Sequence, residues 1–334
     1  MRLRPFCALI VLFVVGCSPI PPVLENRLKI DGWHRLEFTP DGTRFVSLHI
    51  MHGRVSDNAG GETSLRIWDA ETLMPLSQLS DSGQFHDLVI SSDGSRLYLA
   101  WAHEPVRVRA DSAEWTGQGE IRIWNPVTYE EFPSLPFGEI PLNLALSPSG
   151  RYLAITGTAS GAVLLHVWDM HGEPHRIHTV SLHKGLSPIV FLDENTLVHR
   201  DGCDVVRMDI GSGHRIVIRS CGFDHALQIS LMRDPECLAI VTNEGDLRFC
   251  DRAGNPVTLS IDLPNEFIAS ITPSPDRKWC AVQTLTHLEM FRKCGHRWEF
   301  VTRWERINGA MTYRPHDKGF VLGEPRTIDF WSNP

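Results

Sequence analysis

The chain has 334 residues, of which 42% are hydrophobic and 22% are charged, a composition that excludes a largely disordered protein. Its formal net charge is −8. Because phosphate binding needs clustered Lys and Arg, this balance argues against nucleic acid or an anionic lipid surface as the main partner.

The first 16 residues have the pattern of a secretory signal peptide. Arg2 and Arg4 form a short basic region, and the apolar run from Phe6 to Gly16 has about half of the roughly 20 residues that a membrane-spanning helix needs. The run ends in Val14-Val15-Gly16-Cys17, which resembles the bacterial lipobox. In that motif the Cys becomes the lipidated first residue of the mature chain. An uncleaved anchor is the alternative.

The lipobox resemblance implies a lipid anchor at Cys17, a tether over residues 17–22 and a folded part over residues 23–334. Several acyl chains would hold the protein stably, because one acyl chain alone binds a membrane only marginally. Ser18 follows Cys17 where an inner-membrane signal would have Asp. The resemblance therefore implies a bacterial cell-envelope protein, at the outer membrane and periplasm if the host is Gram-negative.

Beyond the tether, short alternating runs and turns follow one another to the end of the chain. Turns such as Pro40-Asp41-Gly42 and Ser92-Asp93-Gly94 lie between pairs of alternating runs, and Pro and Gly supply the backbone angles that these turns need. The third unit continues through LLHVWD into Arg176–Leu182. Period-2 alternation bounded by turns predicts four antiparallel strands in each unit, named a to d from the axis outward.

Each strand c ends in a recurring phrase, such as LRIWD, IRIWN or LHVWD. Its last apolar position is filled by Trp68, Trp124, Trp168, Met208, Cys250, Phe291 and Trp331. These positions are roughly 40 to 45 residues apart except for a longer first interval, a period typical of a four-stranded propeller blade.

The last unit lacks a strand d, since the chain stops soon after Thr327–Trp331. The alternating stretch Val23–Ile30 precedes the first strand a and has no other place. We expect it to pair with Thr327–Trp331, because this closes the ring and removes an open sheet edge. Seven blades follow, with six or eight as alternatives.

The phrase and the turns resemble those of WD40-type propellers across residues 23–334. The resemblance implies an all-β, seven-bladed propeller of four-stranded antiparallel blades, closed by the N-terminal strand. The Gly-His pair that precedes strand a in that family is missing, and His86 precedes Asp87 without its Gly. We therefore do not expect the family's buried His–Trp network, and interpret the chain as a divergent bacterial WD40-like propeller.

Two long connections between strands b and c, residues 51–64 and 102–120, belong to adjacent blades and fall on one face. Insertions confined to one face of a repeat protein often mark its binding face. The candidate partner contacts are His52 and Arg54 in the first connection and Arg107, Arg109 and Trp115 in the second. Arg and Trp are enriched in interface hot spots. The alternative is that residues 102–120 only lengthen strands b and c.

Export permits disulfides, and Cys203 and Cys221 both approach the same face of blade four. We predict a disulfide between them, with two free thiols as the alternative. No cysteine pair has the spacing of a zinc site. A histidine cluster (His171, His175, His178 and His183) falls on an outer strand where the rings cannot all converge, so we expect neither a metal nor a cofactor.

The sequence contains no HExxH, GxSxG or phosphate-binding glycine loop. The favoured hypothesis is a non-enzymatic interaction or scaffold lipoprotein that binds an envelope protein or polymer. The alternative is a periplasmic propeller hydrolase or lyase with its site in the axial channel. A structural relic without a ligand is a third possibility.

Overall fold

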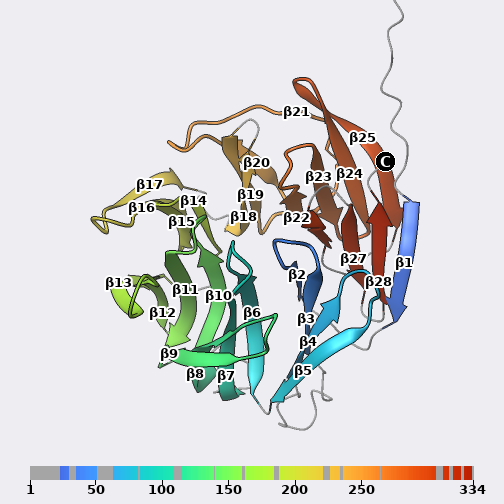
Figure 1. Cartoon of the computed structure of the whole chain (residues 1–334). Coiled ribbons are helices and arrows are strands. Elements are labelled where there is room, and N and C mark those ends of the chain that lie inside the picture. Colours follow the sequence, from blue (N-terminus) through green and yellow to red (C-terminus); the bar gives the residue numbers. More distant parts are fainter. Residues whose placement is uncertain are drawn as a thin grey trace, which may run out of the picture.

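The computed structural model describes residues 23–29, 35–50, 63–81, 83–107, 115–138, 140–159, 162–183, 188–220, 226–233, 236–263, 265–305, 311–315, 319–324 and 327–332. These residues form strands arranged in seven sheets around a central axis, as Figure 1 shows. The protein is a seven-bladed, all-β propeller. Hydrophobic clusters fill the spaces between neighbouring blades, for example where Ile121 of blade two meets Leu153 of blade three.

The first four blades each contain four strands. Blade one has β2 (Arg35–Phe38), β3 (Arg44–Ile50), β4 (Thr63–Asp69) and β5 (Pro75–Asp81). Blade two has β6 (Gln84–Ile90), β7 (Leu97–Arg107), β8 (Trp115–Trp124) and β9 (Glu131–Pro136). Blade three has β10 (Ile140–Leu146), β11 (Tyr152–Ala159), β12 (Ala162–Asp169) and β13 (His175–Leu182). Blade four has β14 (Ile189–Asp193), β15 (Thr196–Asp201), β16 (Asp204–Asp209) and β17 (Arg215–Ser220).

The remaining blades complete the ring. Blade five has β18 (Ala226–Arg233), β19 (Glu236–Thr242) and β20 (Leu247–Cys250). Blade six has β22 (Ile268–Pro273), β23 (Trp279–Thr284), β24 (His287–Cys294), β25 (Arg297–Glu305) and β21 (Ser260–Ile261). Blade seven has β26 (Met311–Tyr313), β27 (Phe320–Glu324), β28 (Thr327–Ser332) and β1 (Val23–Lys29).

The seven phrase positions are structurally equivalent. Each lies opposite the same position of strand b, in the pairs Phe45–Trp68, Leu97–Trp124, Leu153–Trp168, Leu197–Met208, Leu238–Cys250, Cys280–Phe291 and Phe320–Trp331. In blades one and seven the paired Phe and Trp rings stack nearly parallel. Met208, Cys250 and Phe291 are fully buried, so the weaker copies of the phrase fill the same core position as Trp. The predicted alignment is confirmed.

The ring closes through the N-terminal strand. β1 pairs antiparallel with β28, so the last blade receives its outer strand from the start of the fold, as predicted. Arg27 donates two hydrogen bonds of 2.6 Å to the Asp329 carboxylate across this pair. Because Asp329 is nearly buried, the bidentate ion pair fixes β1 on the edge of blade seven.

Blades five and six depart from the four-strand pattern. After Cys250 the chain begins a fourth strand, and the Val257 N–H donates to the Phe249 carbonyl. The next residues leave blade five, and β21 pairs in parallel with Arg297 and Trp298 of β25. Ile261 packs there on a core that includes Trp298. Among the described residues blade five therefore has three strands and blade six has five.

In blades one to five the Asp or Asn at the end of the phrase shapes the turn that follows strand c. The Asp69 side chain accepts hydrogen bonds from the Glu71 and Thr72 N–H groups, and the Asn125 side chain accepts equivalent bonds. Such side-chain turns tolerate left-handed backbone, which Leu73 and Tyr129 adopt at φ 58° and 63°. The Trp-Asp ending thus combines a core residue with a turn residue.

One turn between strands a and b is completed by the next blade. In blades one and two the turn carboxylates Asp41 and Asp93 accept bonds from hydroxyls and N–H groups of their own turns. Blade three has Ser149 at that place, and Glu194 of blade four supplies the carboxylate instead. Glu194 accepts bonds from the Ser147 hydroxyl (2.8 Å), the Ser149 hydroxyl (2.6 Å) and the Ser149 N–H (3.0 Å).

The strand-c indoles show that the WD40 hydrogen-bond network is mostly absent from the described residues. Trp68 donates its indole N–H to the Ser47 hydroxyl at 2.7 Å. In contrast, the indole N–H groups of Trp124, Trp168 and Trp331 are buried without a hydrogen-bond partner. The reason lies in strand b, because the position of Ser47 is taken in those blades by apolar residues: Leu99, Ile155 and Leu322.

Candidate functional site

The connections between strands b and c and between blades lie on one face of the ring, called the top here, and the other turns lie on the bottom. The long hairpin of blade two rises on the top face. β7 and β8 have 11 and 10 residues, more than any other described strand. They stay paired as far as Arg107 and Trp115, with an irregularity between His103 and Val106. Over these residues the connection therefore lengthens strands b and c into an extended hairpin, which is the alternative given for residues 102–120.

The predicted contact residues are only partly placed by the structure. Arg107 and Trp115 face each other across the far end of the hairpin in backbone register, and their side chains lie outside the described part. His52, Arg54 and Arg109 lie wholly outside the described residues. Their role in partner contact stays a prediction.

The base of this hairpin is a packed platform. The Arg122 guanidinium lies 4.1 Å from the centre of the Trp101 ring, and His103 stacks on the same ring at 5.6 Å. Glu120 accepts hydrogen bonds from Arg122 (3.1 Å) and from the Ser134 hydroxyl (2.6 Å). These contacts join strands b, c and d, so they hold the direction in which the hairpin leaves the ring.

A second top-face group lies on blade six and escaped the sequence reasoning. His287 is buried between two carboxylates, with Nδ1 3.5 Å from Glu266 and Nε2 3.4 Å from Glu289. The Thr286 hydroxyl lies 2.9 Å from Nδ1, and Arg303 pairs with Glu289. Because Glu266 precedes strand a and Thr286 follows strand b, the group ties two top-face connections together. The contributing residues come from separate loops, which a linear pattern does not reveal.

Polar side chains tie neighbouring inner strands around the axis. Asp87 on β6 accepts the Leu144 N–H of β10 at 2.8 Å. In the same way Gln228 on β18 accepts the Ile271 N–H of β22 at 2.9 Å and donates to the Ile271 carbonyl. Both side chains directly follow an irregularity in the strand, where the apolar alternation is interrupted. That interruption is the sequence signal from which these hydrogen bonds between inner strands could have been predicted.

One of these ties belongs to a cluster of charges. Arg35 of β2 forms an ion pair with Asp87, whose carboxylate is almost fully buried. Glu37 lies two residues further along β2, and burial raises its pKa to about 7, while Arg35 opposes the rise and Asp87 adds to it. Glu37 is therefore a carboxyl that exchanges a proton near neutral pH, which is the property of a general acid or base.

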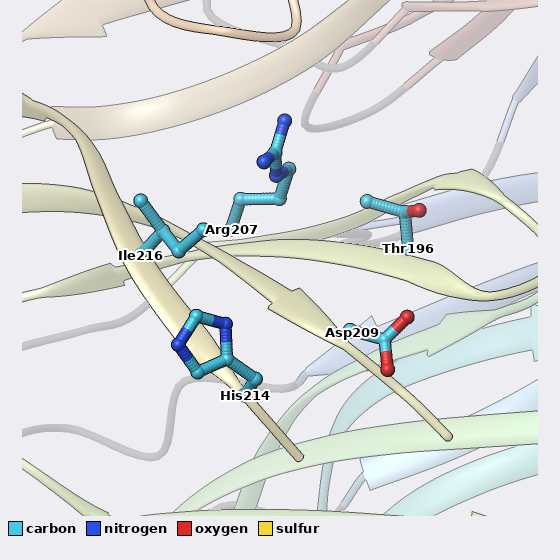
Figure 2. Close-up of a pocket in the computed structure, with 5 residues that line it drawn as sticks. All are labelled: Thr196, Arg207, Asp209, His214 and Ile216. Atoms are coloured by element: carbon cyan, nitrogen blue, oxygen red, sulfur yellow. The ribbon is translucent and has the colours of Figure 1, made fainter. Parts of the chain in front are cut away.

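A shallow pocket of about 260 Å³ lies on the bottom half of blade four (Figure 2). It is lined by Thr196, Arg207, Asp209, His214 and Ile216. The Arg207 guanidinium donates to the Arg252 carbonyl of blade five at 3.0 Å. Hydrogen bonds from the Ser212 side chain and backbone hold the pKa of Asp209 below its usual value. In Figure 2 the Arg207 and Asp209 side chains point away from each other, so they do not form an ion pair across the pocket.

The histidines of the third blade have separate partners. The His178 Nε2 lies 2.6 Å from the Ile210 carbonyl, and the His183 Nδ1 lies 2.7 Å from Asp201. His175 lies 3.1 Å from the carbonyl of Glu173. In the described ranges no group of three or more His, Cys, Asp or Glu side chains is placed to hold a metal ion.

Two of the three cysteines in the predicted covalent sites lie outside the described part of the chain. Cys17 and Cys221 lie outside the described residues, and Cys203 occupies the turn between β15 and β16 as expected. The lipid anchor and the Cys203–Cys221 bond remain predictions. Among the described segments there is no helix with the length and apolar character of a membrane span.

Comparison with known proteins confirms the fold. No protein-family model and no curated protein sequence matches the chain. A chain in the crystal structure of the mitotic checkpoint complex matches it with a TM-score of 0.69 at 15% identity, over 99% of this chain and 98% of the other. The Cps50 (Swd1) β-propeller domain of Myceliophteria thermophila matches with a TM-score of 0.65 at 16% identity, over 92% and 99%. The chain therefore has a WD40-like propeller fold.

Proposed function

We propose that this protein is a non-enzymatic, membrane-tethered propeller of the bacterial cell envelope that presents its top face to an envelope protein or polymer. The observation that carries the proposal is the paired β7–β8 hairpin, which extends the top face of blade two from a base packed around Trp101. A rigid base favours binding, because less conformational freedom is lost when the partner docks.

The proposed tether is short. β1 begins at Val23, about six residues after Cys17, which corresponds to roughly 20 Å of extended chain at about 3.3 Å per residue. In this proposal residues 1–16 are the signal peptide, residues 17–22 are the tether, and several acyl chains on Cys17 hold blade seven close to the membrane. In a Gram-negative host the ring would lie in the periplasm at the outer membrane.

The anchor is tested by metabolic labelling with a palmitate analogue in a bacterial host. We expect the wild-type chain to be labelled and to fractionate with membranes, and Cys17→Ala to be unlabelled. A Cys17→Ala chain that is still labelled would contradict lipidation at this residue.

The binding face is tested by crosslinking in intact envelopes followed by pull-down. Because His103 and Gln118 are paired, residues 104–117 can be replaced by an Asn-Gly turn without breaking the hairpin below them. We expect this hairpin variant to lose one or more partners that the wild type recovers. Met74→Ser, which changes an exposed bottom-face side chain, is the matched control and should recover all partners.

Glu37 supports a second candidate function, a periplasmic hydrolase or lyase that works near the axis. Its pKa of about 7 suits proton transfer at neutral pH. Turnover of ester, glycoside or uronide substrates that disappears in Glu37→Gln, with a pH profile governed by a group near pH 7, would favour this candidate. No turnover by the wild-type chain would leave the scaffold proposal standing.

A further inference from the structure

We propose that the outer edge of β17 is a second docking site, which accepts an extended, acidic peptide segment of a partner by strand addition. The centre of β17 is Ile216-Val217-Ile218, three consecutive β-branched residues between Arg215 and Arg219. Ile216 and Val217 are 43% and 54% exposed, although they lie on opposite faces of the strand. Such residues have high strand propensity, and an apolar edge strand is a template for pairing.

The other described outer strands are protected from pairing. β9 contains prolines at two positions, and β5, β13 and β1 have polar residues at their centres. Pro256 covers part of the edge of β20, and β21 covers part of the edge of β25. Proline removes a donor, and polar or charged residues oppose pairing with another chain. β17 has no proline and no polar residue at its centre, but a β-bulge at Ile218, which Gly254 of blade five contacts, ends its regular edge at Val217.

The backbone of β17 offers a donor and an acceptor outward at Val217. The Asp209 N–H donates to the His214 carbonyl, which sets the alternation of bonds between β16 and β17. By this alternation Arg207 and Ile216 form a hydrogen-bonded pair, in which the N–H of each residue donates to the carbonyl of the other. Val206 and Val217 form the next, non-hydrogen-bonded pair. The Val217 N–H and carbonyl therefore point away from β16, toward an added strand.

The charges on β17 select the occupant. Arg215 and Arg219 each have a buried Nε without a hydrogen-bond partner, and Arg215 also pairs with Asp201 through its Nη2. β17 carries two arginines and no acidic residue, so an added strand with Glu or Asp opposite them is favoured. Antiparallel pairing of two copies centred on Val217 would place Arg215 opposite Arg219 of the second copy. Because like charges directly opposite each other destabilise a strand pair, a second copy is disfavoured.

The pocket of Figure 2 borders this edge, since Ile216 forms part of its wall together with Arg207 and His214. Arg207 is cationic, but the Asp209 carboxylate also lines the pocket, so the preference for an acidic segment rests on the arginines of β17. The site is on blade four and is independent of the hairpin on blade two. Loss of one docking site would therefore leave the other intact.

The probe is a fluorescein-labelled peptide, Thr-Glu-Val-Thr-Val-Glu-Thr with blocked ends, titrated against the full-length chain by fluorescence anisotropy. We expect saturable binding, protection of residues 215–220 from hydrogen–deuterium exchange, and at least tenfold weaker binding when Lys replaces both Glu residues.

Variants separate strand addition from general stickiness. Val217→Pro removes the outward N–H without breaking a ladder bond, and we expect at least tenfold weaker binding. Arg219→Glu should weaken binding as strongly, and it decides the matter if Val217→Pro melts below the wild type. Leu76→Thr, on the exposed face of β5, should bind like the wild type, unlike Val217→Thr. Unchanged binding by Val217→Pro and Arg219→Glu, protection elsewhere alone, or a dimer formed through β17 without peptide would overturn the proposal.

Discussion

The bottom and top faces of the ring are built by different rules. On the bottom, short turns are capped by their own side chains, as Asp69 and Asn125 show, and Glu194 even caps the turn of a neighbouring blade. On the top, the described residues include a hairpin that occurs in blade two and the His287 group that occurs in blade six. The bottom face repeats around the ring, whereas the top face differs from blade to blade.

This difference separates residues that make the fold from residues that can serve function. The recurring phrase places a core residue in each blade, and in blades one to five it adds an Asp or Asn that shapes the next turn, so its repetition reports on folding. The blade-two hairpin and the His287 group interrupt the repeat, and the folding of the blades does not require them. Substitutions in one class of residue at a time test whether folding and binding are separate.

The largest expected effect is on stability in mild acid. Burial lowers the pKa of His199 to about 4, so the folded state disfavours its protonation. This contribution is complete above pH 6.5 and is lost as the pH falls from 6.5 to 4, by about 3 kcal/mol at about 1.4 kcal/mol per pH unit. His86 and His166 act in the same direction, and Glu37, whose raised pKa favours the folded state at low pH, opposes them.

Urea unfolding of the wild type and His199→Leu at pH 7.5 and 5.0 measures this term. The slope of the unfolding free energy against pH gives the number of protons taken up on unfolding, and we expect this number to be smaller by about one in His199→Leu. The bottom-face carboxylates behave differently, because hydrogen bonds lower the pKa of Asp41 and Asp93 and their contribution is lost only below pH 3.8. Equal pH dependence in both chains would show that His199 is not the titrating group.

Glu194→Ala should cost about 2 kcal/mol of unfolding free energy, because it removes three hydrogen bonds to a charged acceptor and leaves the blade-three turn uncapped. Ser149→Asp should also destabilise the protein, since two carboxylates would then meet. The double variant Ser149→Asp with Glu194→Gln restores the pattern of blades one and two, and should recover most of the loss. Additive losses in the double variant would refute the exchange of carboxylates between blades.

The indoles of strand c provide a matched pair within the core. Trp68→Phe should cost about 1 to 2 kcal/mol more than Trp168→Phe, because only Trp68 donates a hydrogen bond, and its loss leaves the buried Ser47 hydroxyl without that bond. Chemical denaturation of both variants gives the difference. Equal losses would mean that the Trp68–Ser47 bond contributes nothing to stability.

The smallest effect is a gain. Arg277 holds the left-handed position of a bottom turn at φ 66°, where the equivalent turns of blades one and two have Gly42 and Gly94. Arg277→Gly should therefore raise the unfolding free energy by about 0.5 to 1 kcal/mol. A melting temperature below that of the wild type would show that the Arg277 side chain stabilises the fold by more than its left-handed backbone destabilises it.

The sequence predicted the ring well, but it did not predict the contacts between adjacent blades, for physical reasons. Phrase spacing located all seven core positions, and the missing last strand located β1 at the edge of β28. It did not reveal that residues after Val257 join blade six, because an alternating run fits either of two neighbouring edges. The Arg35–Asp87 pair and the Glu194 cap were also hidden, since their partners are brought together only by the packing of adjacent blades.

The central claim is that the irregular top face of blade two binds the envelope partner, whereas the repeated turns of the bottom face stabilise the fold. It is tested most directly by measuring crosslinked partner recovery and melting temperature together for two variants: the Asn-Gly replacement of residues 104–117 and Glu194→Ala. The account predicts that the hairpin variant keeps its melting temperature and loses the partner, and that Glu194→Ala melts earlier and keeps the partner. A hairpin variant that recovers every wild-type partner would contradict it.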